Sequence, residues 1–119
     1  MAVRRIPPLM IGVVALAALA PPALAANGTI LASLGSAGSN YSTTNVTISR
    51  GGGLSFQNFD LAPHNVTATK LKKHRPVFRS KDITFGGSAS VTGVSALKRG
   101  TYGYFCSIHP RMKGTLHVR

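Results

Sequence analysis

The sequence predicts an all-β fold, a sandwich formed by a single domain. Apolar and polar residues alternate in short runs, which is the period expected of strands buried on one face. Turns rich in Gly and Ser separate these runs, and no stretch has the periodicity of an amphipathic helix. The chain of 119 residues is also short enough for one domain.

The expected strands begin near residue 28 and continue to the end of the chain. The first should place Ile30, Ala32 and Leu34 on one face, and the glycines at 51–53 should form a turn or bulge. We expect strands within residues 28–34, 45–49, 54–56, 65–69, 88–97, 101–106 and 115–118.

Residues 1–25 have the three parts of a secretory signal peptide. Arg4 and Arg5 supply a positive start, residues 9–20 are apolar, and residues 23–25 form an Ala-x-Ala cleavage site. The apolar part is short for a membrane span, which favours cleavage over the alternative of an uncleaved N-terminal anchor. We therefore expect a mature domain of residues 26–119, exported to the periplasm or outer face of the cell envelope, with no stable membrane span after cleavage.

Residues 70–87 differ from the rest of the chain because they are strongly basic. Pro76 disfavours a long continuous strand in this segment. Only Asp82 opposes its cations, which are Lys70, Lys72, Lys73, Arg75, Arg79 and Lys81. We expect an exposed, mobile loop here, with a short helix or an edge strand at most.

A Cys-x-x-His-x-x-Met motif follows the strand expected at residues 101–106. Cys106, His109 and Met112 offer a thiolate, an imidazole and a thioether, a soft donor set that suits copper better than magnesium or calcium. An electron-transfer copper site also needs a second imidazole. The candidate is His64, which lies between two expected strands, 42 positions (106 − 64) before the cysteine.

Haem attachment, zinc binding and a purely structural role fit this motif less well than copper does. Haem attachment needs a Cys-x-x-Cys-His motif, and the chain contains one Cys. Zinc binds Cys and His, but Met is not among its usual ligands. A single Cys is often a small buried apolar residue, and a single His is often only a hydrogen-bonded polar one. The agreement of four positions favours copper.

The chain resembles the blue copper proteins, or cupredoxins, of the plastocyanin, amicyanin and pseudoazurin group. The resemblance rests on LSFQNFDLAPHNVTA and GTYGYFCSIHPRMKGTLHV and extends over residues 44–119, with a His-to-Met spacing most similar to amicyanin. It implies a Greek-key β-sandwich of about seven to eight strands. It also implies one type 1 copper ion, with the ligands His64, Cys106, His109 and Met112.

The resemblance implies roles for residues around the ligands as well. Asn65 and Ser107 should hydrogen-bond and tie the two ligand loops together. His64 should be shielded, whereas His109 should reach the surface and pass electrons there. The remaining histidines, which we do not expect to bind copper, are His74 and His117.

The ligand set predicts a carrier of single electrons between larger redox proteins. An enzyme is not expected, because these ligands leave no obvious open position for a substrate. The alternative is a protein that captures, stores or delivers copper with the same ligands. Such proteins usually offer exposed Met or His ligands, and beyond Met112 this chain has only Met1 and Met10.

The charge of the chain indicates its partner. The formal net charge is +12, and loss of the two arginines in the signal peptide would leave +10. This field would speed encounter with an acidic redox partner, and the alternatives are solubility or loose attachment to an anionic envelope. Lys98 and Arg99 should lie about 17 Å from the copper, with Arg111 and Lys113 beside it. We expect a monomer, and no nucleic-acid partner because no nucleic-acid-binding module is recognisable.

Overall fold

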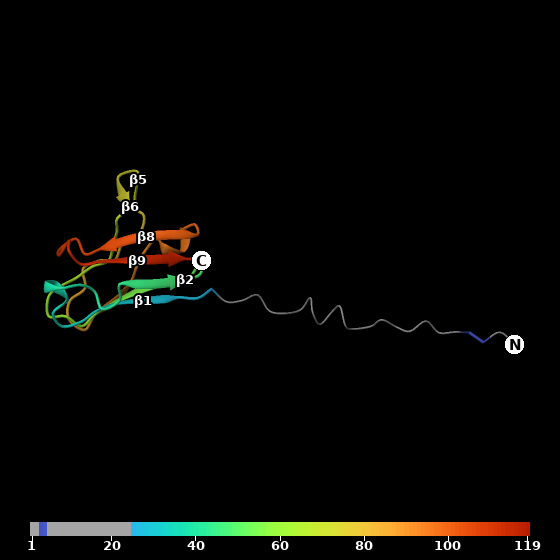
Figure 1. Ribbon diagram of the computed structural model, residues 1–119, viewed down its shortest axis with the longest axis horizontal. Helices are drawn as coiled ribbons and strands as arrows, with labels where there is room; N and C mark the ends of the chain where they lie inside the picture. The colour runs from blue at the N-terminus through green and yellow to red at the C-terminus, as the bar shows by residue number, and fades with distance from the viewer. Residues whose placement is uncertain (1–2, 5–24) are drawn as a thin grey trace.

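The computed structural model describes residues 3–4 and 25–119 (Figure 1). The predicted signal peptide over residues 1–25 lies outside this range apart from residues 3, 4 and 25. In the part of the chain that is described, no helix has the length and apolar character needed to cross a membrane.

The described domain contains nine strands and two short 3₁₀ helices, so the all-β prediction is confirmed. The strands are β1 (Gly28–Ala32), β2 (Asn45–Ile48), β3 (Leu54–Asn58), β4 (Thr67–Ala68), β5 (Leu71–Lys72), β6 (Arg75–Pro76), β7 (Ser88–Ser90), β8 (Gly100–Phe105) and β9 (Lys113–Val118). The 3₁₀ helices are η1 (Ser36–Gly38) and η2 (Val94–Ala96).

Seven of these strands form the two sheets of a Greek-key sandwich, in agreement with the predicted number. One sheet has the order β1-β3-β7 and the other β2-β9-β8-β4, whereas β5 pairs only with β6. The chain passes from the first sheet to the second after β1 and back again after β2. As a result, β1 and β3 run parallel in one sheet, and β2 runs parallel to β9 in the other. β8 pairs antiparallel with β9 and β4.

The core lies between the two sheets and is filled by alternate residues of the strands. Val46 and Ile48 of β2 are buried, and so are Leu54 and Phe56 of β3, as the alternation predicts. Full burial of an aliphatic or aromatic side chain contributes roughly 1.5–3 kcal/mol. The same faces fix the register, because a shift by one residue would expose them.

Two predicted strands are too long. Leu34 is 70% exposed, because β1 ends at Ala32 and the chain turns at Gly35, which has a φ of 89°. The strand predicted at residues 88–97 is only β7. The chain leaves it through Gly93, which has a φ of 96°, and enters η2. Positive φ at both glycines is incompatible with a continued strand.

The basic segment consists of an exposed hairpin followed by a partly buried stretch, residues 77–83, that leads back to the sandwich. β5 and β6 form a hairpin that projects from the sandwich (Figure 1). The chain then runs back beside β4, where Phe78 accepts a hydrogen bond from the Ala68 N–H at 2.9 Å and the Ser80 N–H donates to Val66 at 2.7 Å. Phe78, Ser80 and Ile83 are buried. The expectation of an exposed loop is therefore wrong for residues 77–83, where Phe78 and Ile83 enter the core and Ser80 is buried beside them.

The loops that follow β1, β3 and β8 emerge at one end of the sandwich, opposite the C-terminus (Figure 1). We call this the copper end, defined by residues 33–44, 59–66 and 106–112. It brings the segment containing His64 to the loop that carries the Cys-x-x-His-x-x-Met motif.

Candidate metal centre

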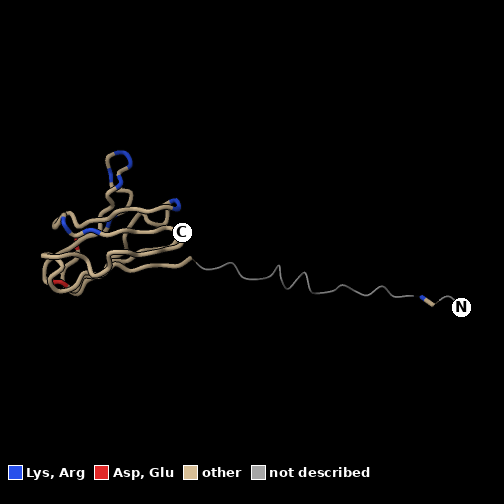
Figure 2. Tube along the Cα trace, in the orientation of Figure 1, with Lys and Arg blue, Asp and Glu red and all other residues tan. Residues whose placement is uncertain are grey.

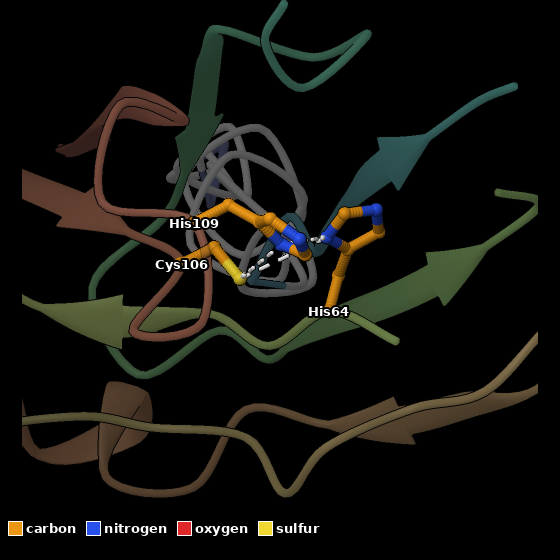
Figure 3. A group of neighbouring side chains, drawn as sticks. All are labelled: His64, Cys106 and His109. Atoms are coloured by element: carbon orange, nitrogen blue, oxygen red, sulfur yellow. Dashed lines mark hydrogen bonds between the residues drawn. The ribbon is translucent and has the colours of Figure 1, made fainter. Parts of the chain in front are cut away.

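Three predicted ligand atoms converge at the copper end (Figure 3). The Cys106 Sγ atom lies 3.8 Å from the Nδ1 atom of His64 and 3.8 Å from that of His109. The two Nδ1 atoms are 3.1 Å apart. His64 follows β3, whereas Cys106 and His109 follow β8, so the site joins two loops that are distant in sequence.

The geometry of these three atoms allows one metal ion to contact all of them. Metal–nitrogen bonds of about 2.0 Å and metal–sulfur bonds of about 2.3 Å can join a nitrogen and a sulfur up to about 4.3 Å apart. The observed nitrogen–sulfur separations of 3.8 Å satisfy this condition. Two imidazoles and one thiolate are also the in-plane donors of a type 1 copper site, so the residues present fit copper.

Met112 belongs to the same loop and is fully buried. Its N–H donates to the His109 carbonyl at 2.9 Å, and its carbonyl accepts from the Cys106 N–H at 3.1 Å. These two backbone bonds close a tight turn directly before β9. A buried thioether in this turn fits the weak axial donor of a type 1 site.

A carboxylate that sequence reasoning missed holds the His64 ring. His64 is fully buried, and its Nε2 atom lies 2.6 Å from Asp60 Oδ2. Donation from Nε2 to the carboxylate orients the ring and leaves Nδ1 as the atom directed at Cys106 and His109. The position of Asp60 in the sequence could have identified it as the partner of His64, because it is one of only two acidic residues and stands four residues before the histidine.

Hydrogen bonds from His64 and from three backbone N–H groups keep the Asp60 carboxylate ionised and in place. Its two oxygens accept from the N–H groups of Gly35 and Ala37 at 3.1 Å and of Leu61 at 2.9 Å. The hydrogen bond with His64, followed by these backbone bonds, lowers the pKa of Asp60 to about 2 against the opposing effect of its burial. The loop after β1 therefore takes part in positioning a histidine that follows β3.

Asn65 ties the two ligand loops together, as predicted. Its Nδ2 donates to Ser107 Oγ at 2.7 Å, and its Oδ1 accepts from the Ser107 N–H at 3.0 Å. Its Nδ2 also donates to Asp82 Oδ1 at 2.9 Å. The backbone N–H of Asn65 donates to Cys106 Sγ at 3.5 Å, which stabilises negative charge on the sulfur.

The four histidines divide as the sequence predicts. His64 is buried and His109 is half-buried, with exposed residues on both sides of it. His74 is exposed in the turn between β5 and β6. His117 points away from the core, and its Nε2 lies 3.2 Å from Asn45 Oδ1. Neither His74 nor His117 belongs to the cluster of ligand atoms.

Comparison with known proteins agrees with this site. The sequence model of a family described as copper binding proteins, plastocyanin/azurin family, matches residues 29–119. Amicyanin from Paracoccus versutus is 35% identical over 78 residues, which cover 66% of this chain. The match covers 57% of that relative, so the chain spans just over half the length of the curated protein it matches.

Solved structures have the same architecture. A novel purple cupredoxin from Nitrosopumilus maritimus superimposes with a TM-score of 0.64 at 26% identity, over 77% of this chain and 99% of that chain. Amicyanin from Paracoccus versutus superimposes with a TM-score of 0.61 at 28% identity, over 87% of this chain and 88% of that chain. The structures confirm the predicted resemblance to the cupredoxins.

Proposed function

Because the chain belongs to the plastocyanin/azurin family of copper-binding proteins, we propose that it carries single electrons between larger redox proteins. The observation that carries the proposal is the convergence of the Sγ and two Nδ1 atoms within 4.8 Å of one another. We assign His64, Cys106, His109 and Met112 as the residues that would hold one copper ion. A copper ion held by these residues would supply one-electron chemistry through its Cu(II) and Cu(I) states.

The protein keeps these ligands in one arrangement, which suits electron transfer. Asp60 fixes the His64 ring, Asn65 fixes the loop that follows Cys106, and backbone bonds close the turn before β9. Each constraint comes from the protein and not from the metal. A site that rearranges little when its charge changes has a low barrier to passing an electron, and this favours a carrier over a protein that releases its copper.

The surface of the copper end supports a role for His109 as the point of electron exchange. The described residues include several large apolar side chains that are exposed in the copper-end loops or beside them, namely Leu34, Phe59, Leu61, Phe85 and Ile108. Phe85 belongs to this end because the neighbouring Gly86 N–H donates to the Asn58 carbonyl. Exposed apolar side chains at the same end of the domain as the half-buried His109 suit a brief contact with another protein.

The first test is the visible absorption and electron paramagnetic resonance of the protein after addition of Cu(II). We expect an intense blue thiolate-to-copper band and a narrow copper hyperfine splitting. Cys106→Ser should abolish the band, whereas His117→Ala, a change at a histidine outside the site, should leave it intact. A protein that retains only colourless Cu(I) would instead indicate copper capture, storage or delivery.

We also propose that residues 1–25 direct export and are removed, so that residues 26–119 act at the periplasm or the outer face of the envelope. The support is the arrangement of charge, apolar residues and Ala-x-Ala at the N-terminus. Mass spectrometry of the exported protein should give the mass of a chain that begins at Ala26. A protein retained in the cytoplasm at full length would contradict this proposal.

A further inference from the structure

A groove lies between the β5–β6 hairpin and the residues that lead into β8. Its volume is about 1010 Å³. Six cationic side chains line it, namely Lys70, Lys72, Lys73, Arg75, Lys98 and Arg99. Figure 2 shows basic residues on the projecting hairpin and at the end of the sandwich near the C-terminus. We call this concavity the basic groove.

No acidic side chain of the described residues lines the basic groove. The two acidic residues of the chain are engaged elsewhere, Asp60 with His64 and Asp82 with Asn65. The six cations therefore repel one another without an internal counter-charge. An anionic group that enters the groove would relieve this repulsion and gain attraction from several charges at once.

The floor of the basic groove is held by contacts with the core. The Tyr102 hydroxyl donates to the Lys98 carbonyl at 2.7 Å, and its ring packs edge-on against Phe78 at a centroid distance of 6.4 Å. Lys70 Nζ lies 5.6 Å from the centroid of the Tyr102 ring. Tyr102 thus fixes the backbone at Lys98 and lies beside the Lys70 ammonium, so the base of the groove is positioned before a ligand binds, which reduces the entropic cost of binding.

We propose that the basic groove binds an extended acidic segment of a partner protein. The cations suit Asp and Glu side chains, and the apolar lining residues Leu71, Val77 and Leu97 suit the apolar residues between them. A concave site with this lining favours a polypeptide segment over a flat lipid surface. On the described hairpin, Leu71 is the one large apolar side chain that is exposed.

The position of the groove gives it a role separate from electron exchange. Tyr102 lines the groove near the start of β8, whereas Cys106 follows the end of that strand. A segment bound in the groove would hold the partner close and leave His109 uncovered. The inference rests on the proposed function for the identity of the partner as a redox protein, but the binding itself is measured without electron transfer.

The test is binding of the copper-loaded protein to a synthetic peptide in which Glu alternates with Leu and Val. The groove variant Lys72→Glu, Lys73→Glu, Arg75→Glu should weaken the affinity roughly tenfold or more. A control variant with the same change in charge replaces three exposed cations outside the groove, Arg50, Lys81 and Lys113, with Glu. We expect the control variant to lose less than about threefold, because its charges lie farther from the peptide.

The blue absorption band, measured in every sample, separates this inference from the proposed function. A wild-type protein with the band but no affinity for the peptide would overturn the groove proposal alone. Equal losses in the two variants would also overturn it, since general charge would then explain the binding. Binding to phosphatidylglycerol vesicles without binding to the peptide would overturn it in favour of a lipid surface. A wild-type protein that lacks the band would contradict only the proposed function.

Discussion

The copper end and the β5–β6 hairpin are held in opposite ways. At the copper end, His64, Cys106 and Met112 are fully buried. Asp60 holds the His64 ring, and the Asn65 N–H donates to Cys106 Sγ. The hairpin has exposed residues, two cross-strand pairs and a turn whose central residues, Lys73 and His74, both have positive φ. The proposed metal ligands are thus held by several contacts each, whereas the cationic side chains project from a structure held mainly at its base.

This difference separates two tasks that one small domain can perform. Ligand geometry must persist while the charge of the site changes, so it depends on buried and mutually supporting bonds. Recognition of an acidic segment depends on charge and exposure, so the hairpin can vary without disturbing the copper site. The predictions below test this separation, beginning with the largest expected effect.

Replacement of Asn65 by Ala should damage the copper end most. The side chain makes four hydrogen bonds, with Ser107 Oγ, Ser107 N–H, Asp82 and Thr67. At roughly 1 kcal/mol each, their loss should lower the free energy of unfolding by about 3–4 kcal/mol. Urea unfolding of the metal-free and copper-loaded protein measures this change, and the copper-loaded form should also show a shifted blue band.

Asn45→Ala is the matched control for this prediction. Asn45 is exposed, and among the described residues its side chain has one hydrogen-bond partner, His117, at 3.2 Å. We expect a loss of less than about 0.5 kcal/mol and no change in the absorption spectrum. Similar losses for the two asparagines would contradict the view that Asn65 joins the ligand loops.

Much of the copper site follows from local sequence, and this is why it could be predicted. Spacing alone places Cys106, His109 and Met112 in one turn, and alternation places Val46 and Ile48 in the core. These features depend on neighbouring residues, whose relative positions the strand period and the turn fix. The pairing of Asn65 with Ser107 was predictable only through the resemblance to cupredoxins, because 42 positions separate them.

The features that sequence did not predict depend on long-range pairing. Asp60 supports His64 only because the loop after β1 presents the N–H groups of Gly35 and Ala37 to its carboxylate. The basic segment returns to the core because Ile83 pairs with His64 through two backbone bonds. Neither contact has a local signature. The position of the basic groove was unpredictable for the same reason, since it joins the hairpin to residues 93–99.

Raising the pH should lower the free energy of unfolding by an intermediate amount, because two tyrosines near the copper end are buried. The Tyr41 hydroxyl donates to the Asn65 carbonyl at 2.5 Å and the Tyr104 hydroxyl to the Thr43 carbonyl at 2.6 Å. Burial raises the pKa of both tyrosines well above the ordinary value of 10.0, and the nearby Cys106 adds to the effect on Tyr41. Above about pH 10, the folded protein therefore retains two tyrosine protons that the unfolded chain loses.

The sign of the effect on stability follows from these protons. Below about pH 10 both states keep these protons, and the stability contributed by the two tyrosines is complete. As the pH rises further, the free energy of unfolding decreases by up to about 1.4 kcal/mol per pH unit for each tyrosine. Unfolding measured between about pH 9 and 11 should show this slope, and Tyr104→Phe should remove the part that belongs to one tyrosine. Phenolate absorbance from Tyr41 or Tyr104 that appears near pH 10 in the folded protein would contradict the prediction.

The smallest effect is expected at the hairpin turn. Lys73 and His74 have φ values of 51° and 64°, as in a type I′ turn, where Asn-Gly is strongly preferred. The double variant Lys73→Asn, His74→Gly should slow exchange of the Val77 amide, which donates to the Lys70 carbonyl at the base of the hairpin, by roughly fivefold. Global stability and the blue band should not change, because the hairpin opens independently of the sandwich.

The variant Lys73→Ala, His74→Ala separates backbone strain from the loss of two side chains. It removes the same side chains but retains residues with a Cβ atom at positive φ, so exchange at Val77 should not become slower. Equal protection in the two double variants would show that strain in the turn does not limit the hairpin. A shift of the blue band in either variant would show that the hairpin and the copper end are coupled, and the comparison between a redundantly held site and an independent hairpin would then fail.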